Sequence, residues 1–164
     1  MSNKLIILGH SNYNGSNVNK ALIEAAAENK INVHNLQLIY PNANFNTKEE
    51  QSKLEAADEI IFQFPVHWFS TPWILKKYFD EVFSYGWAYG SGYNLKEKRA
   101  KLVVTTGVDK NGYTNGLPLK DALQWLKVTL NYCQLDYREE IFAFYGDDKI
   151  TPSKINEYLQ FIEK

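Results

Sequence analysis

A continuous aliphatic run near the start of the chain restricts the fold more than any other feature. The run consists of Leu5, Ile6, Ile7 and Leu8, with no polar residue among them. A strand with one face in water would alternate apolar and polar side chains, so this run is typical of a parallel strand that is buried on both faces. Parallel strands are joined by crossover connections, which are usually helices, and the run therefore predicts an α/β fold.

Segments with strand and helix patterns alternate along the rest of the chain. Strands are expected over residues 4–9, 31–39, 59–63, 100–105 and 141–145, and helices over residues 18–28, 47–57, 72–83, 119–131 and 151–163. Thr47 and Glu50 have the spacing of a capping box, and Thr151 with Pro152 is typical of a helix start. This alternation predicts a doubly wound, five-stranded parallel sheet in the order 2-1-3-4-5, with right-handed crossovers and helices on both faces.

Length and composition restrict the class of protein. The 164 residues are expected to form one domain, residues 1–164. The net charge of −1 provides no general field for nucleic acid or for an anionic membrane surface. The one cysteine, Cys133, excludes an internal disulfide framework and a cysteine metal cluster, which fits a reducing cytoplasm. No apolar run is long enough to span a bilayer, and the apolar stretch at the N-terminus is too short for a secretory signal.

A polar loop follows the first predicted strand. Residues 10–19 are rich in serine, asparagine and glycine and lead into a helix N-terminus, where backbone N–H groups and the helix dipole can bind a phosphate. Ser16 and Asn19 add side-chain donors there. The alternative is that Ser16 or Asn17 simply caps the helix. Because neither the dinucleotide-binding glycine motif nor the P-loop motif occurs, a Rossmann site and a P-loop NTPase are both disfavoured.

The most informative segment covers residues 63–90. A predicted strand ends at Pro65, which has no N–H to extend a sheet, and the loop that follows carries His67, Trp68 and Phe69. A helix with one wide apolar face comes next, and the segment ends in an aromatic stretch that contains glycine. The sequence leaves open whether these aromatic rings form a wall for a planar ligand or a lid packed on the protein's own core.

The same segment resembles the flavodoxin-like NAD(P)H dehydrogenase (quinone) family, which also includes the soluble partner proteins of glutathione-gated potassium efflux systems. Members of this family share a proline-aromatic loop, a Pro-x-x-Leu-Lys helix that ends in Asp-x-Val-Phe, and an aromatic-glycine stretch. The matching positions are Pro65, Trp68, Pro72, Leu75, Lys76, Asp80, Val82, Phe83, Gly86, Ala88, Tyr89 and Gly90. Further matches run from His10 to Thr106, and the resemblance implies a flavodoxin-like sheet.

The resemblance also implies a flavin site, formed by the loops that follow predicted strands one, three and four. The flavin-binding positions that it implies are His10, Ser16, Asn17, Val18, Asn19, Pro65, Val66, His67, Trp68, Phe69, Thr105, Thr106, Gly107 and Val108. In a doubly wound sheet these loops meet at the carboxyl edge, where the strand order reverses between strands one and three. We expect Trp68 and Phe69 to pack against the flavin ring. The family often has a second glycine where this chain has Val108, and that difference restricts the backbone there.

The activity that the resemblance implies is transfer of a hydride from NAD(P)H to FMN, followed by transfer of two electrons to a quinone. FMN is expected because the chain is short for adenosine-binding segments, with FAD as the alternative. Tyr113 and His67 are the candidate catalytic residues. A solvent-facing role for Tyr113, and a loop-stabilising role for His67 or His10, are the alternatives. The histidines are too scattered, without matching carboxylates or cysteines, to suggest a metal site.

The resemblance further implies a homodimer with the flavin near the subunit contact. The aromatic residues that we expect to form the dimer surface and the rim of the substrate pocket are Trp73, Tyr85, Trp87 and Tyr89. An alternative function is that of a regulatory subunit that docks on a potassium-efflux transporter, with quinone reduction secondary. A flavodoxin-type electron carrier is a third interpretation, which the near-neutral net charge disfavours.

Overall fold

A computed structural model describes residues 2–114 and 118–164. Within these residues the strands form one sheet, in which every pair is parallel and the order is β2-β1-β3-β4-β5. The strands are β1 (Lys4–Leu8), β2 (Asn32–Asn35), β3 (Glu59–Pro65), β4 (Arg99–Thr105) and β5 (Asp136–Phe144). The predicted α/β class and strand order are therefore confirmed.

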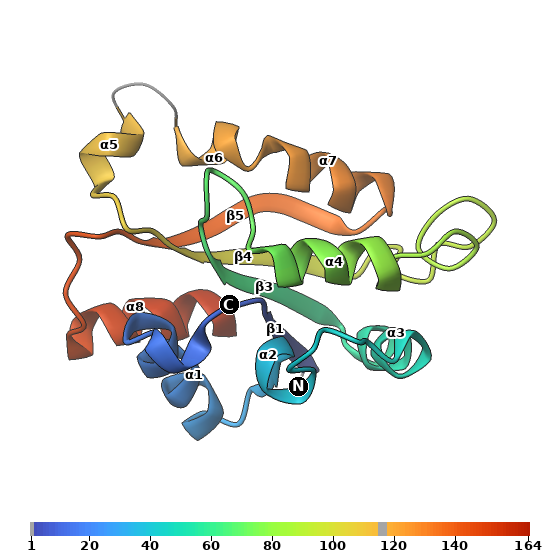
Figure 1. Ribbon diagram of the computed structural model, residues 1–164, viewed down its shortest axis with the longest axis horizontal. Coiled ribbons are helices and arrows are strands. Elements are labelled where there is room, and N and C mark those ends of the chain that lie inside the picture. Colours follow the sequence, from blue (N-terminus) through green and yellow to red (C-terminus); the bar gives the residue numbers. More distant parts are fainter. Residues whose placement is uncertain (1, 115–117) are drawn as a thin grey trace.

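Helices cover both faces of the sheet (Figure 1). They are α1 (Val18–Glu28), α2 (Leu36–Ile39), α3 (Thr47–Ala56), α4 (Trp73–Val82), α5 (Lys110–Thr114), α6 (Leu119–Ala122), α7 (Gln124–Tyr132) and α8 (Pro152–Glu163), together with the 3-10 helix η1 (Tyr13–Gly15). Helices α1 and α8 lie side by side on one face of the sheet, and α4 and α7 lie on the other (Figure 1). Among the described residues, no helix combines the length and the apolar character needed to cross a lipid bilayer.

Two hydrophobic cores lie against the two faces of the sheet. In β1, Ile6 and Leu8 pack in one core with residues of α1 and α8, whereas Ile7 packs in the other core with residues of α4 and α7. All three side chains are fully buried. Each side chain of the strand thus faces an apolar layer, which explains why the run contains no polar residue. Full burial of one such side chain stabilises the fold by about 1.5–3 kcal/mol.

The second strand is shorter than the sequence predicts. The pattern over residues 31–39 predicts one strand, but β2 ends at Asn35 and α2 begins at Leu36. The Asn35 side chain accepts hydrogen bonds from the backbone N–H groups of Gln37 and Leu38, at 3.2 and 3.3 Å. An asparagine that caps a helix in this way competes with strand formation, and it turns the chain away from the sheet.

The start of α3 also differs from the prediction. The capping box predicted from Thr47 and Glu50 does not form, because Asn46 caps the helix by accepting the N–H of Glu49 at 3.4 Å. Glu50 is instead fully buried, and its carboxylate accepts a hydrogen bond from the Tyr40 hydroxyl at 2.7 Å. The carboxylate that the local pattern assigns to the helix end therefore belongs to a buried polar cluster.

The carboxyl-terminal third follows the prediction at α8 and departs from it before that helix. Thr151 caps α8 by accepting a backbone N–H at 3.2 Å, and Pro152 is in the first turn, as predicted. The helix predicted over residues 119–131 is divided at Leu123 into α6 and α7. Strand β5 begins at Asp136, earlier than predicted, because it continues to pair with β4 across an irregularity in the register.

The aromatic stretch after α4 lies at the amino edge of the sheet. This stretch, residues 84–90, continues through an extended loop into the start of β4 (Figure 1). The indole N–H of Trp87 donates to Glu55, and the Trp87 ring centre lies 6.1 Å from that of Phe83. Tyr89 also packs against the hydrophobic core. The prediction that Trp87 and Tyr89 form the rim of the substrate pocket is wrong, because these rings cover the protein's own core.

Candidate functional site

A cavity of about 560 Å³ opens at the carboxyl edge of the sheet. Its walls come from the loops that follow β1, β3, β4 and β5, and from the first turn of α1. The lining residues are His10, Ser16, Asn17, Val18, Asn19, Pro65, Val66, His67, Thr105, Thr106, Gly107, Phe144, Tyr145, Gly146 and Asp148. The volume lies within the range of about 300–1,000 Å³ that is typical of small-molecule sites. The position is the one at which ligands bind in doubly wound sheets.

Most of the residues expected to form the site meet in this cavity. Every expected position in the loop after β1 lines it, and so do the expected positions at the end of β3 as far as His67 and at the end of β4 as far as Gly107. Trp68, Phe69 and Val108 do not line it. The structure thus brings the three expected loops together, although not every residue within them.

A fourth wall of the cavity is absent from the expected set. It consists of Phe144, Tyr145, Gly146 and Asp148, in the loop after β5. Asp148 orders this loop by accepting the backbone N–H of Tyr145 at 2.8 Å, and the Thr106 N–H donates to the Phe144 carbonyl at 2.9 Å. Because β5 is the neighbour of β4, its carboxyl end lies at the same edge. The predicted strand order therefore already indicated that the loop after β5 would line the site, although no sequence motif in that loop indicated it.

The first turn of α1 faces the cavity. Asn17 and Val18 both line it, and N–H groups in the first turn of a helix have no acceptor within the helix. The Ser16 hydroxyl accepts the N–H of Asn19 at 3.1 Å, so the capping alternative holds for Ser16. Asn17 makes no side-chain capping bond. Free N–H groups at the positive end of α1 suit an anionic group such as a phosphate.

His10 is a buried histidine in the wall of the cavity. Its Nδ1 atom accepts the backbone N–H of Asn12 at 3.0 Å, so the neutral imidazole carries its proton on Nε2. Burial of the ring, and then the nearby His67, lower the pKa of His10 from 6.5 to about 4. His10 is therefore a neutral hydrogen-bond donor near pH 7, and through Nδ1 it also stabilises its own loop.

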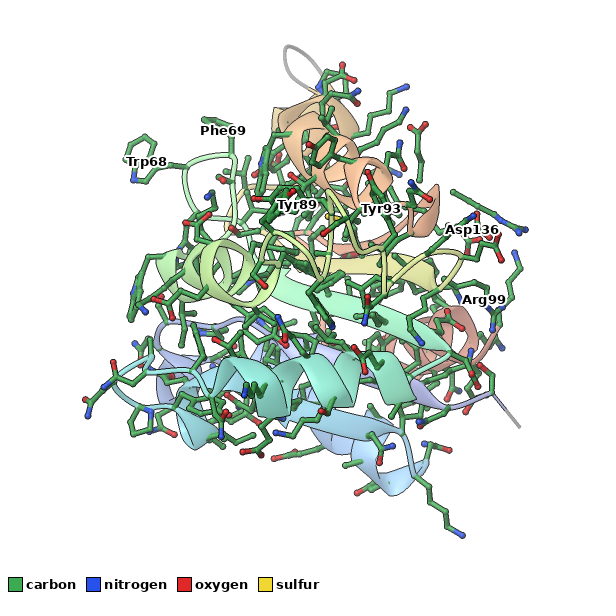
Figure 2. The ribbon with its side chains drawn as sticks, turned by 90° about the vertical axis from the view of Figure 1, so that its right-hand side faces the viewer. Trp68, Phe69, Tyr89, Tyr93, Arg99 and Asp136 are labelled. Atoms are coloured by element: carbon green, nitrogen blue, oxygen red, sulfur yellow. The ribbon has the colours of Figure 1, made fainter. Side chains whose placement is uncertain are left out.

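The loop after β3 makes a tight turn over residues 67–70. The backbone N–H and C=O groups of His67 and Ser70 bond to each other in both directions, at 2.9 and 3.0 Å. Trp68 and Phe69, between them, have φ angles of 48° and 61°, which large side chains rarely adopt. Figure 2 shows both side chains projecting away from the body of the protein, and 94% and 50% of their surfaces are exposed. Neither ring lines the cavity, because the turn directs both of them outward.

The backbone just after β4 is accessible from the cavity. Gly107 lines the cavity, and a Cβ atom added at this residue would have no protein atom within 4 Å. The Val108 carbonyl is used inside the protein, where it accepts the Thr106 hydroxyl at 2.6 Å and the Gly146 N–H at 3.0 Å. Val108 therefore anchors the loop through its backbone, while 48% of its surface faces solvent outside the cavity.

The two candidate catalytic residues have different surroundings. His67 is exposed and lines the cavity. Tyr113, in α5, is buried, and its ring centre lies 6.4 Å from that of Phe69 and 6.1 Å from that of Tyr145. The alternative of a solvent-facing Tyr113 is therefore wrong. Burial, and then the neighbouring Tyr145, raise the pKa of Tyr113, so its hydroxyl keeps its proton near neutral pH.

Comparison with known proteins places this chain in a family. A family model for the flavodoxin-like fold matches residues 2–164. The chain belongs to this flavodoxin-like family. Two relatives of this flavodoxin-like protein come from Bacillus subtilis. The uncharacterised NAD(P)H oxidoreductase YrkL is 32% identical over 95% of this chain and 97% of its own length, and general stress protein 14 is 33% identical over 95% of this chain and 96% of its own.

Solved structures extend the similarity of this flavodoxin-like protein to its whole length. General stress protein 14 from Treponema denticola, solved in complex with FMN, has a TM-score of 0.90 and 31% identity, and the match covers 98% of this chain and 97% of that one. An NADPH-quinone reductase from P. pentosaceus has a TM-score of 0.86 and 27% identity, with 99% and 96% of the two chains covered. The fold around the cavity is therefore shared with proteins whose names refer to FMN and to a nicotinamide cofactor.

Proposed function

We propose that this flavodoxin-like protein is an FMN-dependent NAD(P)H oxidoreductase that passes two electrons to a quinone. The cavity at the carboxyl edge of the sheet carries this proposal, because it joins a helix N-terminus suited to a phosphate with apolar and backbone groups suited to a planar ring. Relatives named NAD(P)H oxidoreductase and NADPH-quinone reductase, and one solved in complex with FMN, support it. When bound, FMN supplies the redox chemistry, by accepting a hydride from NAD(P)H and releasing two electrons to an acceptor.

The groups around the first turn of α1 fit the phosphate of FMN. The N–H groups of Asn17 and Val18 lack acceptors within the helix, and His10 adds a neutral Nε2 donor in the same wall. The Ser16 hydroxyl holds this turn in place by capping it. A phosphate carries the charge of the cofactor, and N–H donors at a helix N-terminus bind such a charge without a lysine or an arginine.

The groups at the ends of β3 and β4 fit the ring of FMN. Pro65 and Val66 present apolar surface, and Gly107 leaves its backbone accessible because no side chain covers it. Backbone N–H groups beside a flavin stabilise the negative charge of its reduced form. We assign His67, which is exposed at the cavity, as the side chain that orients the nicotinamide or the quinone or donates a hydrogen bond to it. Tyr113 is buried against Phe69 and Tyr145 and does not line this cavity, so its catalytic role stays a prediction.

We also propose that the protein is a homodimer. Trp68, Phe69 and Trp73 expose 94%, 50% and 57% of their surfaces, and they lie in one turn and at the start of the next helix. A group of exposed aromatic rings beside a cavity is typical of a protein interface. Light scattering of the purified protein is expected to give twice the 19.0 kDa mass of the chain. A mass equal to that of one chain would contradict the dimer.

The proposed activity can be tested directly with purified protein. The protein is mixed with FMN, the unbound cofactor is removed, and the visible spectrum is recorded. Addition of NADH or NADPH without oxygen should bleach the flavin absorbance, and a quinone should restore it. Failure to retain FMN would contradict the proposal. Retention of FMN without reduction by either nicotinamide would indicate an electron carrier instead.

The role of a regulatory subunit docked on a potassium-efflux transporter stays a prediction, as does a cytoplasmic location. The two functions differ in what deletion of the protein would change. Loss of potassium efflux, with quinone reduction in extracts unchanged, would favour the regulatory role. Loss of quinone reduction with normal efflux would favour the oxidoreductase.

A further inference from the structure

A continuous chain of buried hydrogen bonds runs beneath the cavity. The Tyr158 hydroxyl, in α8, donates to Gln63 Oε1 at 3.0 Å, and Gln63 Nε2 donates to Asn19 Oδ1 at 3.1 Å. Asn19 Nδ2 then donates to Thr105 Oγ1 at 3.0 Å. The four side chains come from α8, β3, α1 and β4, and each has 7% or less of its surface exposed. These hydrogen bonds therefore connect α1, whose first turn forms the proposed phosphate site, to β4, which ends beside that site.

This chain of hydrogen bonds reaches the cavity at one of its ends. Asn19 and Thr105 line the cavity, whereas Tyr158 and Gln63 lie behind them. In each of these hydrogen bonds the donor is on the Tyr158 side and the acceptor is on the cavity side. Each amide group donates one of the bonds and accepts another. Because the Thr105 oxygen accepts from Asn19, the hydrogen of the Thr105 hydroxyl stays available to an acceptor in the cavity.

We propose that Tyr158 and Gln63 are positioning residues, which hold Asn19 so that the Thr105 hydroxyl donates a hydrogen bond into the cavity. This inference rests on the proposed FMN-dependent function, for which Thr105 would contact an oxygen or nitrogen atom of the cofactor. A buried amide keeps its orientation only while both of its ends have hydrogen-bond partners, so the loss of a partner at one end of such a chain disturbs the rest of it.

The phenol holds the far end of these hydrogen bonds. The Tyr158 hydroxyl donates to Gln63 Oε1, Gln63 Nε2 donates to Asn19, and Asn19 Nδ2 donates to Thr105. Without that hydroxyl, the buried Gln63 amide has no partner behind it and can turn or shift, so Asn19 is held less firmly. The Thr105 hydroxyl would then no longer be kept in the orientation in which it donates into the cavity.

Burial increases the effect of Tyr158 and Gln63 on the position of Asn19. The four side chains are shielded from water, so a lost partner is not replaced by a solvent molecule at low cost. Burial also raises the pKa of Tyr158, so the phenol keeps its proton throughout the physiological range. A water-exposed chain would lack this property, because water can donate or accept at any point along it.

The test compares Tyr158→Phe with the matched control Tyr78→Phe. Tyr78, in α4, is also fully buried, and its hydroxyl donates to Glu50 at 3.1 Å, away from the cavity. Both variants lose one buried tyrosine hydroxyl, and Tyr78→Phe is expected to lose at least as much stability because its partner is a carboxylate. The dissociation constant for FMN, measured by quenching of flavin fluorescence, should rise about 10-fold in Tyr158→Phe and stay unchanged in Tyr78→Phe. Gln63→Leu breaks the next bond and should behave like Tyr158→Phe, which keeps the inference testable if one variant fails to fold.

A double-mutant cycle tests whether Tyr158 acts through Thr105. Thr105→Val removes the hydroxyl and Thr105→Ser keeps it. Tyr158→Phe should weaken FMN binding in the wild-type and Thr105→Ser proteins, but should have no further effect in Thr105→Val. Additive losses, or an equal loss in Tyr78→Phe, would overturn the inference, because they would indicate a general loosening of the fold. A wild-type protein that does not bind FMN would overturn the proposed function as well, and this result is obtained before any variant is made.

Discussion

His10 Nδ1 lies 3.0 Å from the backbone nitrogen of Asn12 and accepts its hydrogen. This bond, together with the burial of the ring, keeps the imidazole of this cavity-lining residue neutral, with its proton on Nε2. The conformation of the loop after β1 is thus linked to the protonation state of a residue in the proposed FMN site. Protonation of Nδ1 would remove the acceptor and break the bond that orders the loop.

Acidification is therefore expected to destabilise the protein through His10. Burial of the ring, and then the nearby His67, lower the pKa of His10 from 6.5 to about 4 on folding. The unfolded chain binds the proton first, so this contribution to stability is complete above pH 6.5, is lost as the pH falls toward 4, and does not change below that. A pKa shift of this size corresponds to roughly 3 kcal/mol in the free energy of unfolding. Screening by water in the open cavity reduces this contribution to about 1–2 kcal/mol.

Urea unfolding of the wild type and of His10→Asn, at pH 7 and at pH 5, measures this contribution. The asparagine oxygen can still accept the N–H of Asn12, but it does not titrate. The wild type should lose more stability than the variant between the two pH values. An equal loss in both proteins would show that other groups account for the pH dependence.

Replacing the two aromatic residues of the turn after β3, in Trp68→Asn/Phe69→Gly, is expected to raise the stability of the single subunit while weakening the proposed dimer. Both positions have positive φ angles, which asparagine and glycine adopt readily in two-residue turns. Relief of this strain should raise the free energy of unfolding by about 1–2 kcal/mol. Gly86→Ala is the opposite change at a φ of 80° with space for the side chain, and it should lower stability by about 1 kcal/mol. At a protein concentration low enough to separate the proposed dimer, a double variant less stable than the wild type would contradict this prediction.

Gly107→Ala is expected to weaken FMN binding without changing stability. A Cβ atom at Gly107 would meet no protein atom within 4 Å, and it would project into space that the cofactor is proposed to fill. The free energy of unfolding should change by less than about 0.5 kcal/mol, while the dissociation constant for FMN should rise by about 10-fold. Gly146→Ala is the control, because its Cβ would lie 2.6 Å from the Gly107 carbonyl oxygen and should destabilise the fold. Unchanged FMN affinity in Gly107→Ala would place the cofactor elsewhere.

Glu50→Gln is expected to be among the most damaging substitutions outside the cavity. The buried Glu50 carboxylate accepts from the Tyr40 and Tyr78 hydroxyls at 2.7 and 3.1 Å, and it lies 2.7 Å from His34 Nε2 and 3.0 Å from Lys53 Nζ. Removing the charge leaves these donors with a weaker partner, which should lower the free energy of unfolding by about 3 kcal/mol. Glu49→Gln removes an exposed carboxylate that pairs with the same lysine, at 2.6 Å, and should cost less than about 1 kcal/mol. Similar losses in both variants would contradict this prediction.

The Glu50 cluster also predicts a second loss of stability in acid. Burial acts to raise the pKa of Glu50, but hydrogen bonds from His34, Tyr40 and Lys53 outweigh it, and the pKa falls from 4.5 to about 2. The contribution is therefore complete above pH 4.5 and is lost as the pH falls toward 2. Unfolding of the wild type and of Glu50→Gln between pH 5 and pH 3 measures it. The difference in stability between the two proteins should shrink over this interval, and a constant difference would contradict the prediction.

The sheet and the edge that holds the cavity were predictable from the sequence. The run of apolar residues from Leu5 to Leu8 requires two apolar layers, and alternation with helical segments requires parallel strands. In a doubly wound sheet, the loops after strands one, three and four must then meet at one edge. Each of these inferences depends on residues that are neighbours along the chain.

Other features of the site depend on residues that are far apart in sequence. Gln63 reads as the polar end of a buried strand, yet its side chain bonds to Asn19 and Tyr158, which are 44 and 95 positions away. In the same way, Glu50 has the spacing of a helix cap, but Tyr78 on another helix helps to hold it in the core. Local patterns describe the element that carries a side chain and do not identify the partner that it meets.

The direction of the aromatic side chains was decided only in three dimensions. The residues after Pro65 resemble a ligand wall, but hydrogen bonds between His67 and Ser70 close a turn that directs Trp68 and Phe69 outward. Apolar periodicity was enough to establish the class of fold, because the class follows from burying apolar side chains on both faces of each strand. The resemblance to the flavodoxin-like family agreed with the predicted strand order, and that order defines the edge at which the loops gather. The side chains that enter the cavity, and the directions of the hydrogen bonds beneath it, were set by tertiary packing, because they depend on the relative positions of elements that the pattern describes one at a time.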